Sequence, residues 1–166
     1  MKFELKKLSP DAVSAALKKA EHYRLLNEPV AAESICRDIL LVEPQHRQAL
    51  ITLVLALTDQ FDVDTSSRAD EARRMLEQLP ESYERYYYLG LVNERRATAY
   101  LRRAHAGNAG WAYDYYQQAM KSYEEAERTR PPGNDDALLR WNTCARMIMQ
   151  NKLEAVREQF TEAMLE

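Results

Sequence analysis

The sequence has few residues that interrupt helices, with four glycines and six prolines among 166 residues. The prolines fall mainly between segments in which apolar residues recur every three to four positions. Such segments, rich in alanine, leucine, glutamate and arginine, are typical of amphipathic helices. A chain of this length is usually one domain with a sizeable core. The sequence therefore predicts a single all-α domain over residues 1–166.

The chain also has little net charge, −3 at neutral pH, which gives no general reason to expect nucleic acid or an anionic membrane as its partner. Its two cysteines, Cys36 and Cys144, lie far apart on apolar helical faces, which favours buried thiols in a reducing compartment over a disulfide. Residues 1–8 contain no sustained apolar run, so we expect neither a signal peptide nor a membrane span. The predicted location is the cytoplasm.

Patterns that carry catalytic chemistry are missing. The sequence has no glycine loop that could hold a phosphate and no nucleophile elbow. His22, His46 and His105 fall on different predicted elements, at spacings that do not suit a metal ion. We therefore predict a protein that is not an enzyme and has no metal or other cofactor.

The segment 83–130 differs from the rest of the chain because it holds nine of the ten tyrosines. Its first arm, 83–105, contains no proline and one glycine, and its second arm, 111–130, contains neither. The glycines of 107–110 separate the arms, and Pro131 ends the second one. The pattern predicts a long helical hairpin.

Shorter helix pairs flank this hairpin, and their spacing recurs along the chain. Ser9 and Pro10 are expected to start the first helix, which should run to about Leu26. The next helix has the same spacing of small and large residues as the second arm of the hairpin. The matching sets are Ala32, Cys36, Ile39 and Pro44, and Ala119, Tyr123, Ala126 and Pro131.

These spacings resemble the tetratricopeptide repeat, a helix–turn–helix unit of about 34 residues with a small residue in each helix where the two cross. The resemblance implies a right-handed α-α superhelix of about four helix pairs, at approximately 12–45, 47–80, 83–131 and 137–165. It also implies contact between Ala20 and Ala32. The second unit departs from the family, because Val54 replaces a small residue and Pro80 comes early. The connector 59–67 is longer than a repeat turn needs.

The third unit departs most, because Gly90 and Ala119 are 29 positions apart whereas Ala20 and Ala32 are 12 apart. The extra residues predict an elongated hairpin, with about eight more residues on each arm, or ~12 Å of helix. We expect this hairpin to project beyond the edge of the stack. In the fourth unit, a last helix with Ala155, Val156, Phe160 and Met164 would cap the array.

The resemblance implies a concave face, lined by the first helix of each pair, that holds an extended peptide or a partner helix. Tyrosine and arginine often carry interface energy, and Tyr87 or Tyr88 could instead pack between neighbouring repeats. Leu17 and Glu21 stand where one chaperone-binding subclass has lysine and asparagine, so that function is not expected. Glu94 should lie on the groove face. The candidate groove residues are Gln48, Ile51, Leu55, Tyr87, Tyr88, Leu91, Arg95, Asn142 and Arg146.

The hairpin extension offers a second surface, with two interpretations. In one, Tyr100, Leu101, Trp111 and Tyr115 hold the two arms together while the arginines are solvated or paired. In the other, the tip docks a partner chain, which could be a second copy. A basic arm with aromatic residues can also bind single-stranded nucleic acid, but the acidic second arm argues against this. The candidate surface residues are Arg96, Tyr100, Arg102, Arg103, Tyr113 and Tyr116.

The function these features predict is that of a non-catalytic scaffold or adaptor for a protein or peptide, with self-association through the hairpin as an option. The alternative is a small secretion-type chaperone, because short three-repeat proteins of similar size include such chaperones. Nucleic-acid binding and catalysis are less favoured.

Overall fold

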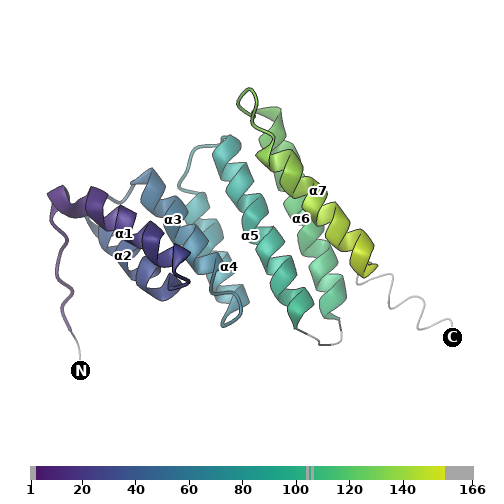
Figure 1. Cartoon of the computed structure of the whole chain (residues 1–166), viewed down its shortest axis with the longest axis horizontal. Helices are drawn as coiled ribbons and strands as arrows, with labels where there is room; N and C mark the ends of the chain where they lie inside the picture. Colours follow the sequence, from purple (N-terminus) through teal and green to yellow (C-terminus); the bar gives the residue numbers. More distant parts are fainter. Residues whose placement is uncertain (1–2, 104, 106, 156–166) are drawn as a thin grey trace.

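The computed structural model describes residues 3–103, 105 and 107–155, and within them the protein is all-helical, with seven α-helices and no strand. The prediction of an all-α chain is confirmed, whereas the superhelical repeat arrangement stays a prediction. Neighbouring helices pack against each other along the row shown in Figure 1. The helices are α1 (Val13–Leu25), α2 (Pro29–Val42), α3 (Arg47–Thr58), α4 (Thr65–Leu76), α5 (Tyr83–Arg102), α6 (Asn108–Arg128) and α7 (Asp136–Asn151).

The start of α1 differs from the prediction. The Ser9 side chain makes no capping hydrogen bond. Its carbonyl oxygen instead accepts a hydrogen bond from the Ala12 amide at 2.9 Å, which closes a 3-10 turn before α1 begins at Val13. Val156, Phe160 and Met164, which the predicted last helix contains, lie outside the described residues.

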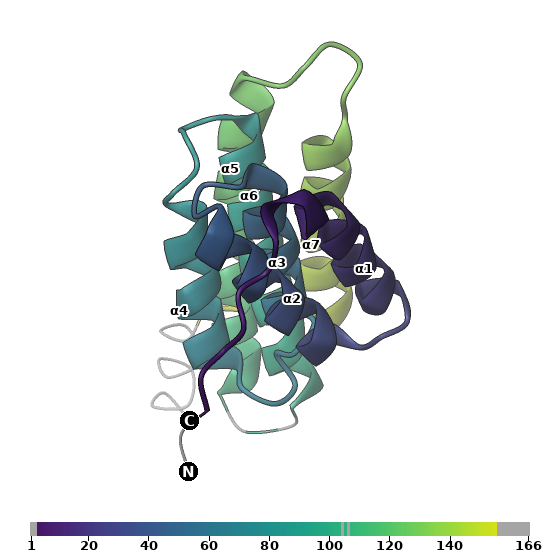
Figure 2. The ribbon, with the colours of Figure 1, turned by 90° about the vertical axis from the view of Figure 1, so that its left-hand side faces the viewer.

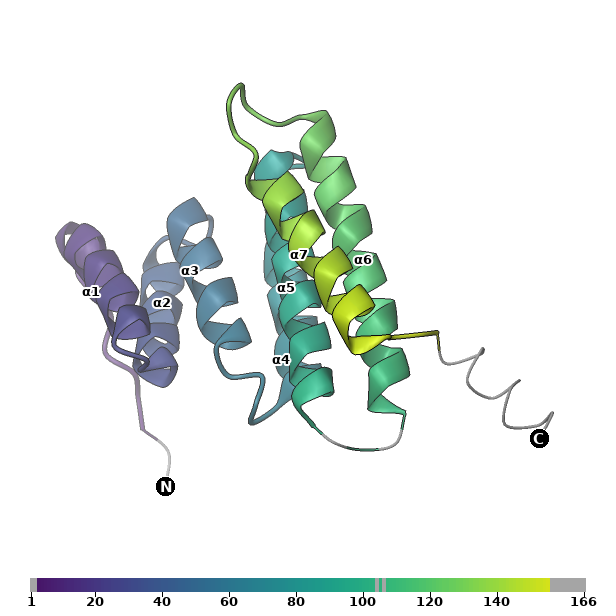
Figure 3. The same cartoon turned by 45° about the vertical axis from the view of Figure 1, so that its right-hand side comes forward.

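Helix α5 joins the two largest parts of the core. Val92 and Ala99 belong to a buried cluster built mainly from α1 to α4, and Ala97 belongs to one built mainly from α6 and α7. Ala20 and Ala32, the small residues expected at the α1–α2 crossing, are both fully buried in the first cluster. Figure 3 shows α5 between α3 on one side and the α6–α7 layer on the other. The N-terminal and C-terminal halves are thus connected through one helix.

The hairpin of α5 and α6 is the longest helix pair, as the sequence predicts. Helix α5 has 20 residues against 13 in α1 and 12 in α3, and α6 has 21 against 14 in α2 and 12 in α4. The break is shorter than predicted, because α6 begins at Asn108 and includes Gly110. Gly107 has a φ of 87°, a left-handed conformation that glycine adopts without strain.

Both cysteines are fully buried and form no disulfide. Burial raises the pKa of each thiol from 9.0 to about 12, so the thiolate that reacts is almost absent at neutral pH. We expect a thiol reagent such as Ellman's reagent to modify two thiols per unfolded chain and almost none in the folded protein at pH 8. Because the folded state binds these protons more tightly, stability should fall as the pH rises from about 9 towards 12. Rapid labelling of folded protein would contradict the buried placement.

Candidate binding cleft

Polar side chains link the first helix of each predicted pair to the next. The Gln48 amide donates a hydrogen bond to Glu21 at 3.4 Å, which joins α3 to α1. Arg47 on α3 forms a close ion pair with Glu84 on α5. Farther along, Arg140 on α7 pairs with a carboxylate on α5 at 3.1 Å. Separate polar contacts therefore join α1 to α3, α3 to α5 and α5 to α7.

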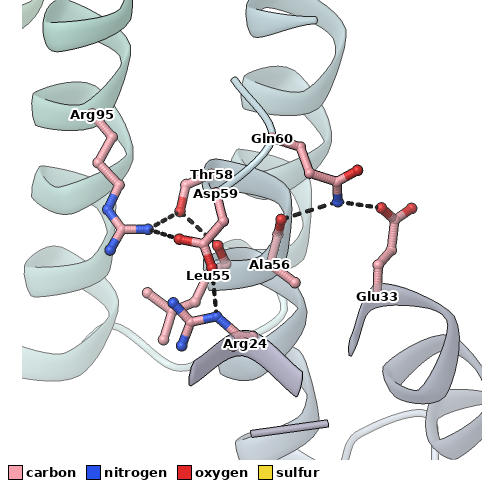
Figure 4. A network of polar contacts seen from close by, with 8 residues as sticks. All are labelled: Arg24, Glu33, Leu55, Ala56, Thr58, Asp59, Gln60 and Arg95. Carbon is pink, nitrogen blue, oxygen red and sulfur yellow. Dashed lines mark hydrogen bonds and ion pairs between the residues drawn. The ribbon is translucent and has the colours of Figure 1, made fainter. Parts of the chain in front are cut away.

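Asp59, directly after α3, joins α1 and α5 at the opposite end of α3 from Arg47 and Gln48. One carboxylate oxygen accepts a hydrogen bond from Arg24 Nε at 2.8 Å, and the other accepts one from Arg95 Nη1 at 2.6 Å. Arg95 Nη1 also donates to the Thr58 hydroxyl at 2.6 Å. Figure 4 shows the two arginines reaching the end of α3 from α1 and α5. They supply positive charge at the negative end of the α3 dipole, where the last turn of α3 has no basic residue of its own.

A cleft of about 410 Å³ opens beside this triad, where α1, α3 and α5 end. Arg102 is an exposed member of the lining and forms no ion pair with any described residue. The walls are mostly polar, so the cleft suits a charged or hydrogen-bonding group better than an apolar one. It is lined by Arg24, Asn27, Thr58, Asp59, Phe61, Asp62, Arg95, Thr98, Ala99 and Arg102.

Of the nine predicted groove residues, Arg95 alone lines the cleft. The placement of Ile51 and Leu91 in an open groove was wrong, because their side chains are only 1% and 4% exposed. Helix α3 packs against four other helices, α1, α2, α4 and α5, so little of its surface is exposed to solvent. Leu55 packs partly buried against the core. Among the remaining polar candidates, Gln48 and Arg146 are exposed and Asn142 is partly buried.

Tyr87 and Tyr88 are half-buried; Tyr87 packs against other aromatic rings, and Tyr88 also packs against the cluster built mainly from α1 to α4. The Tyr87 ring stacks on Tyr83 at 5.7 Å between centroids and meets the edge of Tyr88 at 5.2 Å. Tyr87 also lies 6.0 Å from the Tyr123 ring. Burial raises the pKa of the Tyr88 hydroxyl. These contacts match the alternative in which the two tyrosines pack between helices.

Two arginines of the hairpin extension, Arg96 and Arg103, contact other parts of the chain. Arg103 donates hydrogen bonds to the carbonyl oxygens of Phe61 and Asp62, at 2.8 and 3.1 Å, in the connector between α3 and α4. Arg96 is 8% exposed, and its guanidinium lies 4.3 Å from the centre of the Tyr115 ring. The α5–α6 hairpin was expected to project freely. One of its sides instead lies against the connector between α3 and α4.

The aromatic candidates of the extension are also mainly structural. Tyr116 was expected at the surface, but its ring is fully buried and its hydroxyl lies 3.0 Å from the Thr98 hydroxyl. Tyr100 stacks on Tyr115 at 5.5 Å, as in the interpretation in which aromatic residues hold the arms together. Tyr100 and Tyr113 are partly buried, and Arg102 is the exposed member of the predicted surface set.

Glu94 is buried rather than open to the groove, with 7% of its surface exposed. Its carboxylate accepts hydrogen bonds from the Tyr123 hydroxyl at 2.6 Å and from Arg140 Nη1 at 3.1 Å. Burial and the neighbouring carboxylate together raise the pKa of Tyr123 strongly. This network ties α5, α6 and α7 together and leaves the carboxylate little access to a ligand.

Sequence reasoning missed Asp59, which Arg95 contacts, and Arg24, which pairs with the same carboxylate. The available signal was the length and polarity of the connector that begins at Asp59, but the sequence does not show which distant arginines reach it. In the part of the chain that the structure describes, no group of three or more metal-binding side chains converges. None of the described helices combines the length and apolar character needed to cross a membrane. No model of a known protein family matches the sequence, and no curated protein compared with it matches either.

Proposed function

We propose that this protein is a non-catalytic scaffold that holds a segment of a partner protein against the side formed by α1, α3, α5 and α7. The observation that carries the proposal is the polar cleft at the ends of α1, α3 and α5, where Arg24 and Arg95 flank Asp59 and Arg102 is exposed. The resemblance to tetratricopeptide repeats supports it, because first helices line the binding face in that family. Buried, unpaired cysteines suit a cytoplasmic adaptor.

The cleft is suited to binding because its charged groups are already in place. Asp59 holds both neighbouring guanidinium groups, so a ligand would not have to order them. Arg102 adds a positive charge without an internal partner among the described residues. A partner segment that presents acidic or carbonyl oxygen atoms would find directional donors here.

Reversal of charge at Arg102 tests this function with a matched control. Arg102→Glu should reduce capture of partner proteins from the native lysate by about tenfold or more, as expected when a central interface residue is lost. Arg128→Glu changes the net charge equally at an exposed site on α6 and should leave capture unchanged. Capture is measured by quantitative mass spectrometry of material retained by the immobilised full chain. Equal retention by both variants would refute the cleft as the binding site.

A further inference from the structure

A second cavity lies between α2 and α4, with α3 as its floor, and its volume is about 460 Å³. Leu50 and Leu53 on α3 are buried at the floor, while Leu40 on α2 and Met75 on α4 form walls. Pockets of this size accommodate small ligands or a few side chains. Unlike the polar cleft, this groove is mainly apolar and therefore suits hydrophobic side chains.

The groove begins where the ion pairs between α2 and α4 end. Glu33 pairs with Arg68 at 2.9 Å, and one turn later Arg37 pairs with Glu71 at 2.8 Å. One turn later the facing residues are leucine and methionine, and just past the helix ends they are Pro44 and Gln78; none of these can form an ion pair. Ion pairs therefore join α2 and α4 at one end, and an apolar groove lies between the two helices at the other end.

The N-terminal segment runs alongside this opening. Leu8 is partly buried and packs with Val13, Ile39 and Ala49, which fixes the segment to the body of the protein. Leu5 lines the groove but is still 77% exposed. Figure 2 shows the segment descending in front of the space between α2 and α4.

Phe3 is the other large apolar residue of this segment, and it is 79% exposed. In an extended chain, residues two positions apart face the same side and are separated by about 7 Å. Phe3 and Leu5 can therefore enter the same groove together. The link to Leu8 keeps them at a high effective concentration beside it.

We infer that the α2–α4 groove is a binding site for an extended apolar segment and that the chain's own N-terminal arm, residues 3–7, is its occupant. Closure seats Phe3 and Leu5 against Leu40, Leu41 and Met75 and removes apolar surface from water on both sides. An external segment with the same alternation of apolar residues binds here only when the arm is displaced. This inference does not depend on the binding function assigned to the polar cleft.

A hydrophobic dye distinguishes a seated arm from one that is merely exposed. The double variant Phe3→Ser/Leu5→Ser removes two apolar side chains, yet it should raise the fluorescence of bound anilinonaphthalene sulfonate about twofold or more, because the groove is uncovered. The matched control Leu25→Ser/Leu26→Ser removes two exposed leucines elsewhere and should leave the signal equal or lower. A signal that falls or stays constant in the Phe3→Ser/Leu5→Ser variant, with helicity retained in circular dichroism, would overturn the inference.

Disulfide trapping identifies the occupant. We expect Phe3→Cys/Gln78→Cys to form an intramolecular disulfide under mild oxidation, because Gln78 lines the groove and the native thiols are buried. Phe3→Cys/Gln118→Cys, with its second cysteine exposed on α6, should stay reduced under the same conditions. Non-reducing electrophoresis and mass spectrometry separate the products. If only covalent dimers form, the arms exchange between copies, and closure by the chain's own arm is overturned. The absence of any disulfide between positions 3 and 78 would overturn it as well.

Discussion

Gly90→Val is expected to lower the free energy of unfolding by about 3 kcal/mol, although valine is intrinsically a better helix former than glycine. A Cβ atom at Gly90 would lie 2.5 to 2.8 Å from three atoms of the Tyr123 ring. That ring is fully buried, and its hydroxyl is held by Glu94, so it has little room to move. Chemical denaturation followed by circular dichroism measures the loss.

A double-mutant cycle tests whether the Tyr123 ring is the cause. Tyr123→Ala alone should cost about 3–5 kcal/mol, because it removes a large buried ring. In the Gly90→Val background the same change should cost at least ~1 kcal/mol less, since it also removes the clash. Additive losses would show that Gly90 is required for some reason other than this contact.

Glu94→Ala should destabilise the protein by about 3 kcal/mol, because it leaves the buried Tyr123 hydroxyl without its acceptor and Arg140 without its counter-ion. Glu84→Ala is the matched control. Glu84 lies on the same helix and pairs with Arg47, which is largely exposed, so its loss should cost no more than ~1 kcal/mol. Unfolding by urea compares the two variants, and equal losses would contradict a structural role for the buried network.

Residues whose roles depend on local spacing were predictable from the sequence. Apolar periodicity identified the helices, and the distance from Gly90 to Ala119 predicted the long hairpin that α5 and α6 form. The small residues Ala20 and Ala32 are buried as expected. Such features follow from the geometry of one helix or of two neighbours, which the order of residues largely determines.

The lining of the proposed binding side was harder to predict, because it depends on what surrounds each helix. A single apolar stripe cannot describe α3, which packs against four other helices and thereby buries Ile51. The partners of Arg95 come from the end of α3, and their approach depends on how separate units stack. Likewise, Arg103 reaches a connector about 40 positions earlier in the chain. Contacts of this kind are set by tertiary packing, which periodicity does not encode.

The connector between α3 and α4 and the long α5–α6 hairpin are two departures from the regular repeat that the sequence predicts. The connector, residues 59–64, and the two hairpin helices are longer than the corresponding parts of the α1–α2 pair, and Arg103 joins them through backbone carbonyl groups. One side of the polar cleft is formed by this connector, through Phe61 and Asp62, and another by Arg102 at the end of α5. The two departures therefore help to build the proposed binding site.

The most direct test of the proposed function places a photoactivatable residue, p-benzoylphenylalanine, at Asp62 in the cleft or at Lys121 on α6. Both positions are exposed, and only the first lines the cleft. After irradiation in the native lysate, mass spectrometry identifies proteins joined covalently to each variant. If the cleft anchors the partner, Asp62 gives a specific adduct, which Arg102→Glu abolishes, and Lys121 gives none. An adduct from Lys121 with none from Asp62 would contradict binding in the cleft.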